Sequence, residues 1–241
     1  MKTPRLFISS LVLAATLLGC GTKSAEEKAA LKKTEAALYE KAIKGDAKAL
    51  AELRGRAEKG DADAQFVLGT MYAAGLGVAK DEVEAAKWYR KAADQGVAEA
   101  QSSLGYRYSN GQGVAKDEVE AVKWYRKAAD QGYAVAQLGL GVMYATGEGV
   151  AKDEVEAVKW IRKAADQGDA AAQFALGVMY EDGTGVAKDE VEAYKWWLLA
   201  GAGGNKIANE IAKRNIGLIE KRLTPAQRAE GQKRAREFKK K

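Results

Sequence analysis

The acidic residues of a recurring hexapeptide are the first candidates for chemistry in this sequence. "KDEVEA" begins at Lys80, Lys116, Lys152 and Lys188, so Asp81, Glu82 and Glu84 recur four times. Carboxylates this close together could act as an acid–base pair or as calcium ligands. Acidic side chains also stabilise the first turn of a helix, and Asp81 stands three residues before Glu84, in capping-box spacing. Because an apolar helical pattern follows each hexapeptide, we expect Asp81 to accept from free helix amides while Glu84 reaches back.

Other catalytic signals in the chain are weak. The segment "GLGVAK", residues 75–80, has glycines suited to a phosphate loop, but no strand precedes it and the third glycine is missing. It recurs wherever a helix must end. The 241 residues include no histidine, which excludes Ser–His and Cys–His nucleophiles and the commonest metal ligand. We therefore predict a non-enzymatic protein without catalytic, cofactor or metal sites, for which a small-molecule substrate is not expected.

The N-terminal segment resembles an export signal. Lys2 and Arg5 precede an apolar run from Leu6 to Leu18, which is too short to span a bilayer comfortably. The run ends in "LLGC", similar to the lipobox of bacterial lipoproteins, and this resemblance implies a signal peptide at 1–19, lipid on Cys20 and a tether at 20–23. The alternative is a spare cysteine in a signal cleaved further on. Because Gly21 rather than Asp follows the cysteine, the resemblance implies an outer-membrane lipoprotein facing the periplasm or the cell surface.

The elements that would hold these residues come from a strict 36-residue period. Such a period is typical of a solenoid. Within a copy two apolar sets fall at i, i+3, i+4, i+7 and i+8, which predicts two helices forming a hairpin. In the first copy these sets are Ala64, Val67, Leu68, Met71 and Tyr72, then Ala85, Trp88, Tyr89, Ala92 and Ala93. One hairpin cannot cover Trp88 alone, so we expect neighbouring copies to shelter it.

The unit "A-x-x-x-LG-x-MY-x-x-G-x-GV-x-x-D-x-x-x-A-x-KWY-x-KAA-x-QG" resembles the Sel-one-like (Sel1-like) repeat, a relative of the tetratricopeptide repeat. The resemblance covers four copies over residues 62–204. It implies an all-α helical-hairpin solenoid, wound as a right-handed superhelix, that binds partners on its concave face. Arg107 and Ile161 are local departures, and the fourth copy ends in "KWWLLAGAGG" instead of "KWYRKAADQG".

Atypical segments flank the four copies, as capping repeats usually do. Residues 24–61 contain a predicted helix and a contracted repeat, which we interpret as the N-terminal cap. Residues 205–241 predict C-terminal capping helices and a basic tail; Thr224, Pro225 and Gln227 have the spacing of a helix start. The charges lost from the end of the fourth copy indicate that this C-terminal segment covers it.

The copies also differ in an informative way. On the first helix, positions such as Ala64, Gln65 and Leu68 hardly change, whereas the opposite face varies and carries several apolar residues. First helices line the concave side of a helical solenoid, so we predict that this face binds a protein or peptide. The alternatives are an ordinary solvent face, or partial burial against the next copy. The candidate residues are Asp63, Phe66, Thr70, Glu99, Ser102, Tyr106, Val135, Leu138, Val142, Ala171, Phe174 and Val178.

Charge is distributed unevenly along the chain. The formal net charge is +6, and twelve basic residues against four acidic ones lie after Gly204. Such a tail could contact anionic lipid, but without a base-contacting motif it predicts no nucleic-acid binding. The leading hypothesis is an envelope-anchored scaffold. The alternatives are an envelope enzyme or a peptidoglycan- or β-lactam-binding protein, which some exported relatives suggest, and a cytoplasmic adaptor if the signal is not used.

Overall fold

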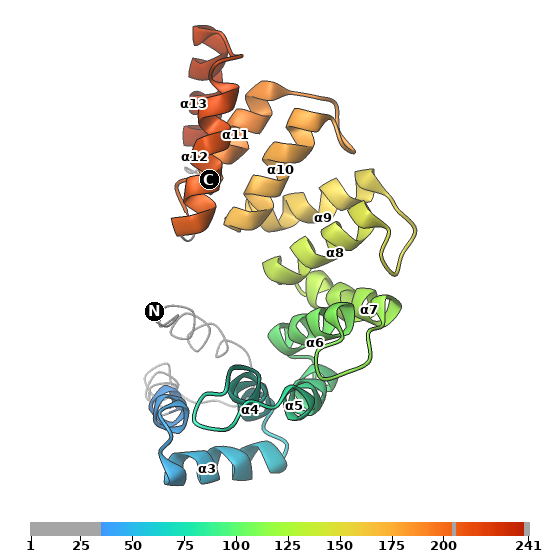
Figure 1. The fold of residues 1–241 in the computed structure, drawn as a ribbon, viewed down its shortest axis with the longest axis vertical. Helices are drawn as coiled ribbons and strands as arrows, with labels where there is room; N and C mark the ends of the chain where they lie inside the picture. Colours follow the sequence, from blue (N-terminus) through green and yellow to red (C-terminus); the bar gives the residue numbers. More distant parts are fainter. Residues whose placement is uncertain (1–34, 204–205, 239–241) are drawn as a thin grey trace, which may run out of the picture. The chain divides into compact units, whose positions relative to one another are not determined.

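The computed structural model describes residues 35–203 and 206–238 (Figure 1). The predicted signal peptide, Cys20, the tether and the first residues of the N-terminal helix lie outside this part of the chain. All regular structure in the described residues is helical, which confirms the predicted all-α class. Residues 35–43 form a helix. The labelled helices that follow are α3 (Ala47–Glu58), α4 (Ala62–Ala74), α5 (Glu82–Asp94), α6 (Ala98–Asn110), α7 (Glu118–Asp130), α8 (Ala134–Thr146), α9 (Glu154–Asp166), α10 (Ala170–Asp182), α11 (Glu190–Ala200), α12 (Lys206–Ile219) and α13 (Pro225–Phe238).

The contacts divide the chain into two compact units, one reaching Ala100 together with 112–114 and the other comprising 101–111 and 115–241. In the first unit, Leu53, Leu68 and Met71 form the centre of a core that α3 and the helix at 35–43 share with α4. In the second unit, Trp196 and Leu176 belong to one apolar cluster, and Trp197 and Ile219 to another. Each core is therefore built between neighbouring helices rather than around one centre, as in a repeat array.

Each hairpin is closed by a glycine on its first helix. A Cβ on Gly69 would come within 2.9 Å of the Tyr89 ring, and one on Gly105 within 3.0 Å of Tyr125. In the third copy Gly141 meets Ile161 at 2.5 Å, and in the fourth Gly177 meets the indole of Trp197. The glycine thus makes room for the bulky residue of the second helix, whose buried area stabilises the hairpin.

Consecutive copies within the second unit are joined through the loop glycines. Gly149 has a φ of +66°, and a Cβ there would overlap the backbone carbonyl of Glu118 at the start of α7. Gly185 stands in the same relation to Glu154 of α9. The "GxG" loop is therefore a packing device that lets one copy's loop closely approach the start of the second helix in the copy before it. Arg126 adds a hydrogen bond to the Tyr144 hydroxyl, and Arg162 one to the Tyr180 hydroxyl.

The hexapeptide acids cap the second helices, as expected for the aspartates. Asp81 Oδ1 accepts from the amides of Val83 and Glu84, each at 2.9 Å. The predicted return bond from Glu84 is wrong. The Asp81 amide donates instead to the Tyr72 carbonyl at 3.0 Å, and the Glu84 carboxylate pairs with Lys87 at 2.6 Å. The bend of the preceding loop brings that carbonyl to the amide, so the glutamate is released to pair along its own helix.

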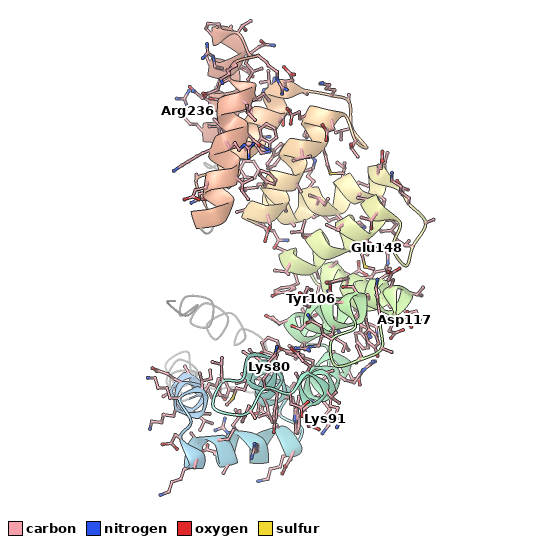
Figure 2. The ribbon with its side chains drawn as sticks, viewed as in Figure 1. Lys80, Lys91, Tyr106, Asp117, Glu148 and Arg236 are labelled. Atoms are coloured by element: carbon pink, nitrogen blue, oxygen red, sulfur yellow. The ribbon has the colours of Figure 1, made fainter. Side chains whose placement is uncertain are left out.

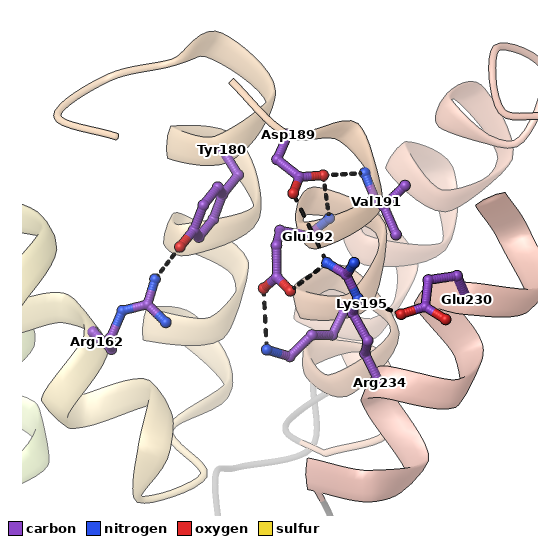
Figure 3. A network of polar contacts seen from close by, with 8 residues as sticks. All are labelled: Arg162, Tyr180, Asp189, Val191, Glu192, Lys195, Glu230 and Arg234. Atoms are coloured by element: carbon purple, nitrogen blue, oxygen red, sulfur yellow. Dashed lines mark hydrogen bonds and ion pairs between the residues drawn. The ribbon is translucent and has the colours of Figure 1, made fainter. Parts of the chain in front are cut away.

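The C-terminal helices pack on the fourth copy. The Trp196 and Phe238 rings meet edge-to-face with their centroids 5.3 Å apart, and Ala235 of α13 is buried in the same cluster. Figure 3 shows Arg234 of α13 between Glu230, at 2.8 Å, and Glu192 of α11, at 2.9 Å. As a consequence the Lys195 side chain is 13% exposed, whereas its counterpart Lys159 is 63% exposed.

The start of α13 has the predicted capping box. The amide of Thr224 donates to Gln227 Oε1 at 2.9 Å, and the amide of Gln227 donates to Thr224 Oγ1 at 3.3 Å. In α12 the apolar residues divide between two sides: Ile219 is buried, while Ile211 and Leu218 are exposed. Helical spacing alone did not distinguish these two roles.

Candidate partner-binding face

The carboxylates that first suggested chemistry have structural partners. Asp117, Asp153 and Asp189 cap helix amides just as Asp81 does, and Glu120 and Glu156 pair with Lys123 and Lys159. Among the described residues, no three metal-binding side chains gather in a way that could hold an ion. No helix in that part of the chain is long and apolar enough to cross a bilayer. These acids therefore serve to start helices and to pair with the cations beside them.

The second unit contains most of the predicted binding residues. Tyr106 of α6, labelled in Figure 2, is 52% exposed, and Val135 and Val142 of α8 are 50% and 44% exposed. Ala171 of α10 is exposed as well, and Leu138 is half-buried. We call Tyr106, Val135, Leu138, Val142 and Ala171 the first-helix face of the second unit. Covering apolar side chains that are this exposed lowers the free energy, so they favour binding of a partner.

The other candidates in the second unit belong to its packing. Ser102 is buried. Phe174 and Val178 are half-buried against a cluster that contains Trp197 and Ile219, and the Phe174 and Trp197 ring centroids lie 6.4 Å apart. Packing against α11 and the capping helix α12 thus covers Phe174 and Val178 of the last copy, whereas Ala171 stays exposed. The accessible part of the strip in this unit lies on α6 and α8 and at the start of α10.

A rigid layer lies behind Tyr106. The Tyr125 ring packs between Gly105 of α6 and Gly139 of α8, where added Cβ atoms would come within 3.0 and 2.8 Å of it. Burial raises the pKa of Tyr125 to about 12, and a hydrogen bond with Ser109 opposes this shift. The phenol is therefore neutral at physiological pH and acts as a packing element. This backing holds α6 and α8 at a fixed spacing beneath the exposed side chains.

The first unit contains the remaining candidates. Phe66 is buried, with its ring centroid 5.7 Å from that of Tyr89, and Thr70 Oγ1 accepts from the Tyr89 hydroxyl at 3.2 Å. Asp63 and Glu99 are half-buried. Burial, aided by the charges of Asp61, Glu35 and Glu99, raises the pKa of Asp63 to about 6. This part of the predicted strip is therefore acidic and largely packed rather than apolar and open.

The sequence did not predict a glutamine ladder that ties the hairpins together. In the third copy Gln167 Nε2 donates to Gln137 Oε1 at 2.8 Å, and Gln137 Nε2 donates to the Ala129 carbonyl of the preceding copy at 3.2 Å. Gln95 and Gln65 form the same pair in the first copy at 2.7 Å, and Gln65 reaches Ala57. The unvarying, buried Gln65 position was the only signal, because nothing local reveals a partner thirty residues away.

Two helices per 36-residue unit, repeated without insertions, define a tetratricopeptide-like helical repeat protein. The family model described as "Sel1 repeat" matches residues 62–97, 98–133, 134–169 and 170–205. The chain belongs to the Sel1 repeat family. Members of this family are generally helical scaffolds for protein interactions.

Solved structures agree with this assignment. A protective antigen of uropathogenic Escherichia coli with the same repeat fold is 36% identical, with a TM-score of 0.77; the match covers 88% of this chain but only 47% of that one. A Sel1 repeat protein from Oxalobacter formigenes is 39% identical over 73% of this chain and 72% of that chain, with a TM-score of 0.63. The immunity protein Pa5087 of Pseudomonas aeruginosa is 25% identical, covering 71% and 67%, with a TM-score of 0.51. No curated protein matches the chain significantly.

Proposed function

We propose that the protein is a non-enzymatic scaffold of the bacterial envelope that binds a protein or peptide through its first helices, on the side expected to be concave. The single observation that carries this proposal is the exposure of Tyr106, Val135 and Val142 above the packed layer around Tyr125. A hydrophobic group on a rigid support loses little conformational entropy on binding. A scaffold, rather than a catalyst, needs only such a surface.

The size of this apolar group sets a limit on its contribution. Fully burying a valine-sized side chain is worth roughly 1.5–3 kcal/mol, so the three half-exposed residues together contribute about 3 kcal/mol. A micromolar complex requires about 8 kcal/mol. We therefore expect the partner to add polar contacts with neighbouring exposed residues such as Asn110.

The proposed place of this scaffold is the envelope, with lipid on Cys20 holding it at the outer membrane, facing the periplasm or the cell surface. The lipobox-like "LLGC" supports the anchor. The similar Escherichia coli protein is described as a protective antigen, which is compatible with a place in the envelope. Metabolic labelling with a palmitate analogue, together with cell fractionation of the Cys20→Ser variant, tests this part. An unlabelled wild-type protein in the cytoplasmic fraction would favour the adaptor alternative instead.

The binding face is tested by photo-crosslinking in intact cells. A photoreactive amino acid at Val142 should crosslink one defined species, whereas the same amino acid at Val155 should not. Val155 is the matched control because it is 55% exposed at the start of a second helix. Tyr106→Asp should remove the Val142 crosslink. Crosslinking from both positions, or insensitivity to Tyr106→Asp, would contradict the proposed face.

The alternative of an envelope enzyme or a peptidoglycan- or β-lactam-binding protein is decided by separate assays. Hydrolysis of a chromogenic β-lactam above background, or retention on purified peptidoglycan that survives Tyr106→Asp, would replace the scaffold proposal.

A further inference from the structure

Helix α12 exposes two large apolar side chains on one side. Ile211 is 47% and Leu218 is 52% exposed, and they lie seven residues apart, two turns along the same side of the helix. The side that packs on α11 is different, since it carries the buried Ala212 and Ile219. In the described part of the chain, no helix buries Ile211 or Leu218. By contrast, Trp197 of α11, which packs in a cluster with Ile219 of α12, is only 1% exposed.

Basic side chains flank these two residues. Arg214 and Lys221 are exposed, and neither has a carboxylate partner among the described residues, whereas Lys213 lies on the other side of the helix. This contrasts with the repeats, where Lys87, for example, pairs with Glu84 at 2.6 Å. Arg214 falls between Ile211 and Leu218 on the helix, three residues after one and four before the other. Glu210 is the exposed acid nearby, so this surface has a net positive charge.

We propose that this surface of α12, made of Ile211, Arg214 and Leu218 with Lys221 just after the helix, docks on a bilayer that carries anionic phospholipid headgroups. Apolar side chains bordered by unpaired cations are typical of a helix lying in the interface, with its side chains between headgroups and acyl chains. A protein partner would be expected to supply carboxylates for individual cations; a lipid surface supplies a continuous negative potential instead. The charge contrast with the repeats favours lipid.

The expected affinity is modest. Each cation near an anionic surface strengthens binding roughly fivefold, and the two half-exposed apolar residues together add a comparable factor. Stable membrane attachment generally needs two weak signals. The surface would therefore orient the array on a membrane to which another anchor already holds the protein. This inference rests on the envelope location proposed above for its setting, but α12 should bind anionic vesicles whether or not Cys20 is lipidated.

The test uses the full chain with Cys20→Ser and one new cysteine, labelled with an environment-sensitive nitrobenzoxadiazole dye. Leu218→Cys places the dye on the surface, and Val155→Cys places it at a matched exposed site elsewhere. Vesicles contain phosphatidylcholine alone or with about one third phosphatidylglycerol. We expect a blue shift and roughly twofold brightening at 218 with the anionic vesicles only, weakened by salt, and no change at 155.

A charge-reversed variant distinguishes vesicle binding by this surface from vesicle binding by the predicted signal peptide at 1–19. Arg214→Glu together with Lys221→Glu should weaken the response at 218 at least about tenfold without altering the circular-dichroism spectrum, since both side chains are exposed. Equal responses at 218 and 155, no response at 218, or a response indifferent to charge reversal would overturn the proposal. A blue shift that appears without vesicles as protein concentration rises would instead assign the surface to a second copy. Failure here would leave the Val142 crosslink untouched, so the two proposals fail separately.

Discussion

Gly149 lies directly against the backbone carbonyl of Glu118, so the loop of one copy touches the helix start of the copy before it. Gly149 has a φ of +66°, and because it has no side chain, nothing separates the two. The same relation joins Gly185 to Glu154. The glycine loop that superficially suggested phosphate binding is thus the point where consecutive copies meet. Its recurrence in all four copies has a steric cause.

Gly149→Ala should therefore destabilise the protein more than Gly168→Ala. Both glycines have positive φ, which costs a residue with a Cβ about 1–2 kcal/mol, but a Cβ on Gly168 meets nothing within 4 Å. The overlap with Glu118 should add about 1–3 kcal/mol for Gly149→Ala. Urea unfolding of the two variants measures the difference. Equal losses would show that the loop does not hold the copies together.

The glutamine ladder should show as a coupling energy. Gln137→Ala removes a buried amide that both accepts from Gln167 and donates to the Ala129 carbonyl, and should cost about 2 kcal/mol. Gln167→Ala should cost less because Gln167 is exposed. A double-mutant cycle should give a coupling of about 1 kcal/mol between the two. Strict additivity would mean that the 2.8 Å contact contributes nothing.

The C-terminal helix α13 should detach when Leu198 and Leu199 of the fourth copy are replaced by the charged residues that the third copy has at these positions. Leu199 is 4% exposed under α13, whereas Lys163 at the equivalent position is exposed and stacks 3.7 Å over the Trp160 ring. Leu198→Arg with Leu199→Lys would bury unpaired charge, which should expel α13. Hydrogen exchange should then lose protection over 225–238. The reverse change, Lys163→Leu, is the control and should leave exchange in α13 unchanged.

Asp63 should make stability depend on pH. Its pKa is raised from 3.8 to about 6, so the folded protein retains a proton that the unfolded chain releases, and stability falls as pH rises from about 4 through 6. Asp63→Asn removes this loss. The melting temperature should therefore increase at pH 7.5 and change little at pH 4. An increase of equal size at both values would indicate that the raised pKa is not the cause.

Local features of this fold were predictable from the sequence. The period, the Asp81 cap and the covering of "KWWLLAGAGG" each follow from a pattern within a few residues, and the structure confirms them. The tryptophans Trp124, Trp160 and Trp196 are buried as expected, whereas Trp88 in the first copy is only half-buried. Two departures arise from longer-range geometry: Glu84 does not reach back because the Tyr72 carbonyl occupies the amide, and the glutamine ladder joins residues thirty positions apart.

The candidate face was predictable only in part. Variation among copies located the first-helix positions, but it could not separate Tyr106, which is exposed, from Phe66, which packs on Tyr89. That difference depends on which helix lies next to each position. Likewise, the exposure of Ile211 and Leu218 depends on how α12 docks, which helical periodicity does not determine.

The most direct test of the central claim compares Val142→Asp with Leu140→Asp, two residues apart on α8. Val142 is 44% exposed on the first-helix face, whereas Leu140 is fully buried. We predict that Val142→Asp keeps the wild-type circular-dichroism spectrum and melting temperature but abolishes partner crosslinking by a photoreactive amino acid placed at Tyr106, and that Leu140→Asp unfolds. If Val142→Asp unfolds like Leu140→Asp, or melts normally and still crosslinks, the face is core or plain surface and the scaffold account is contradicted.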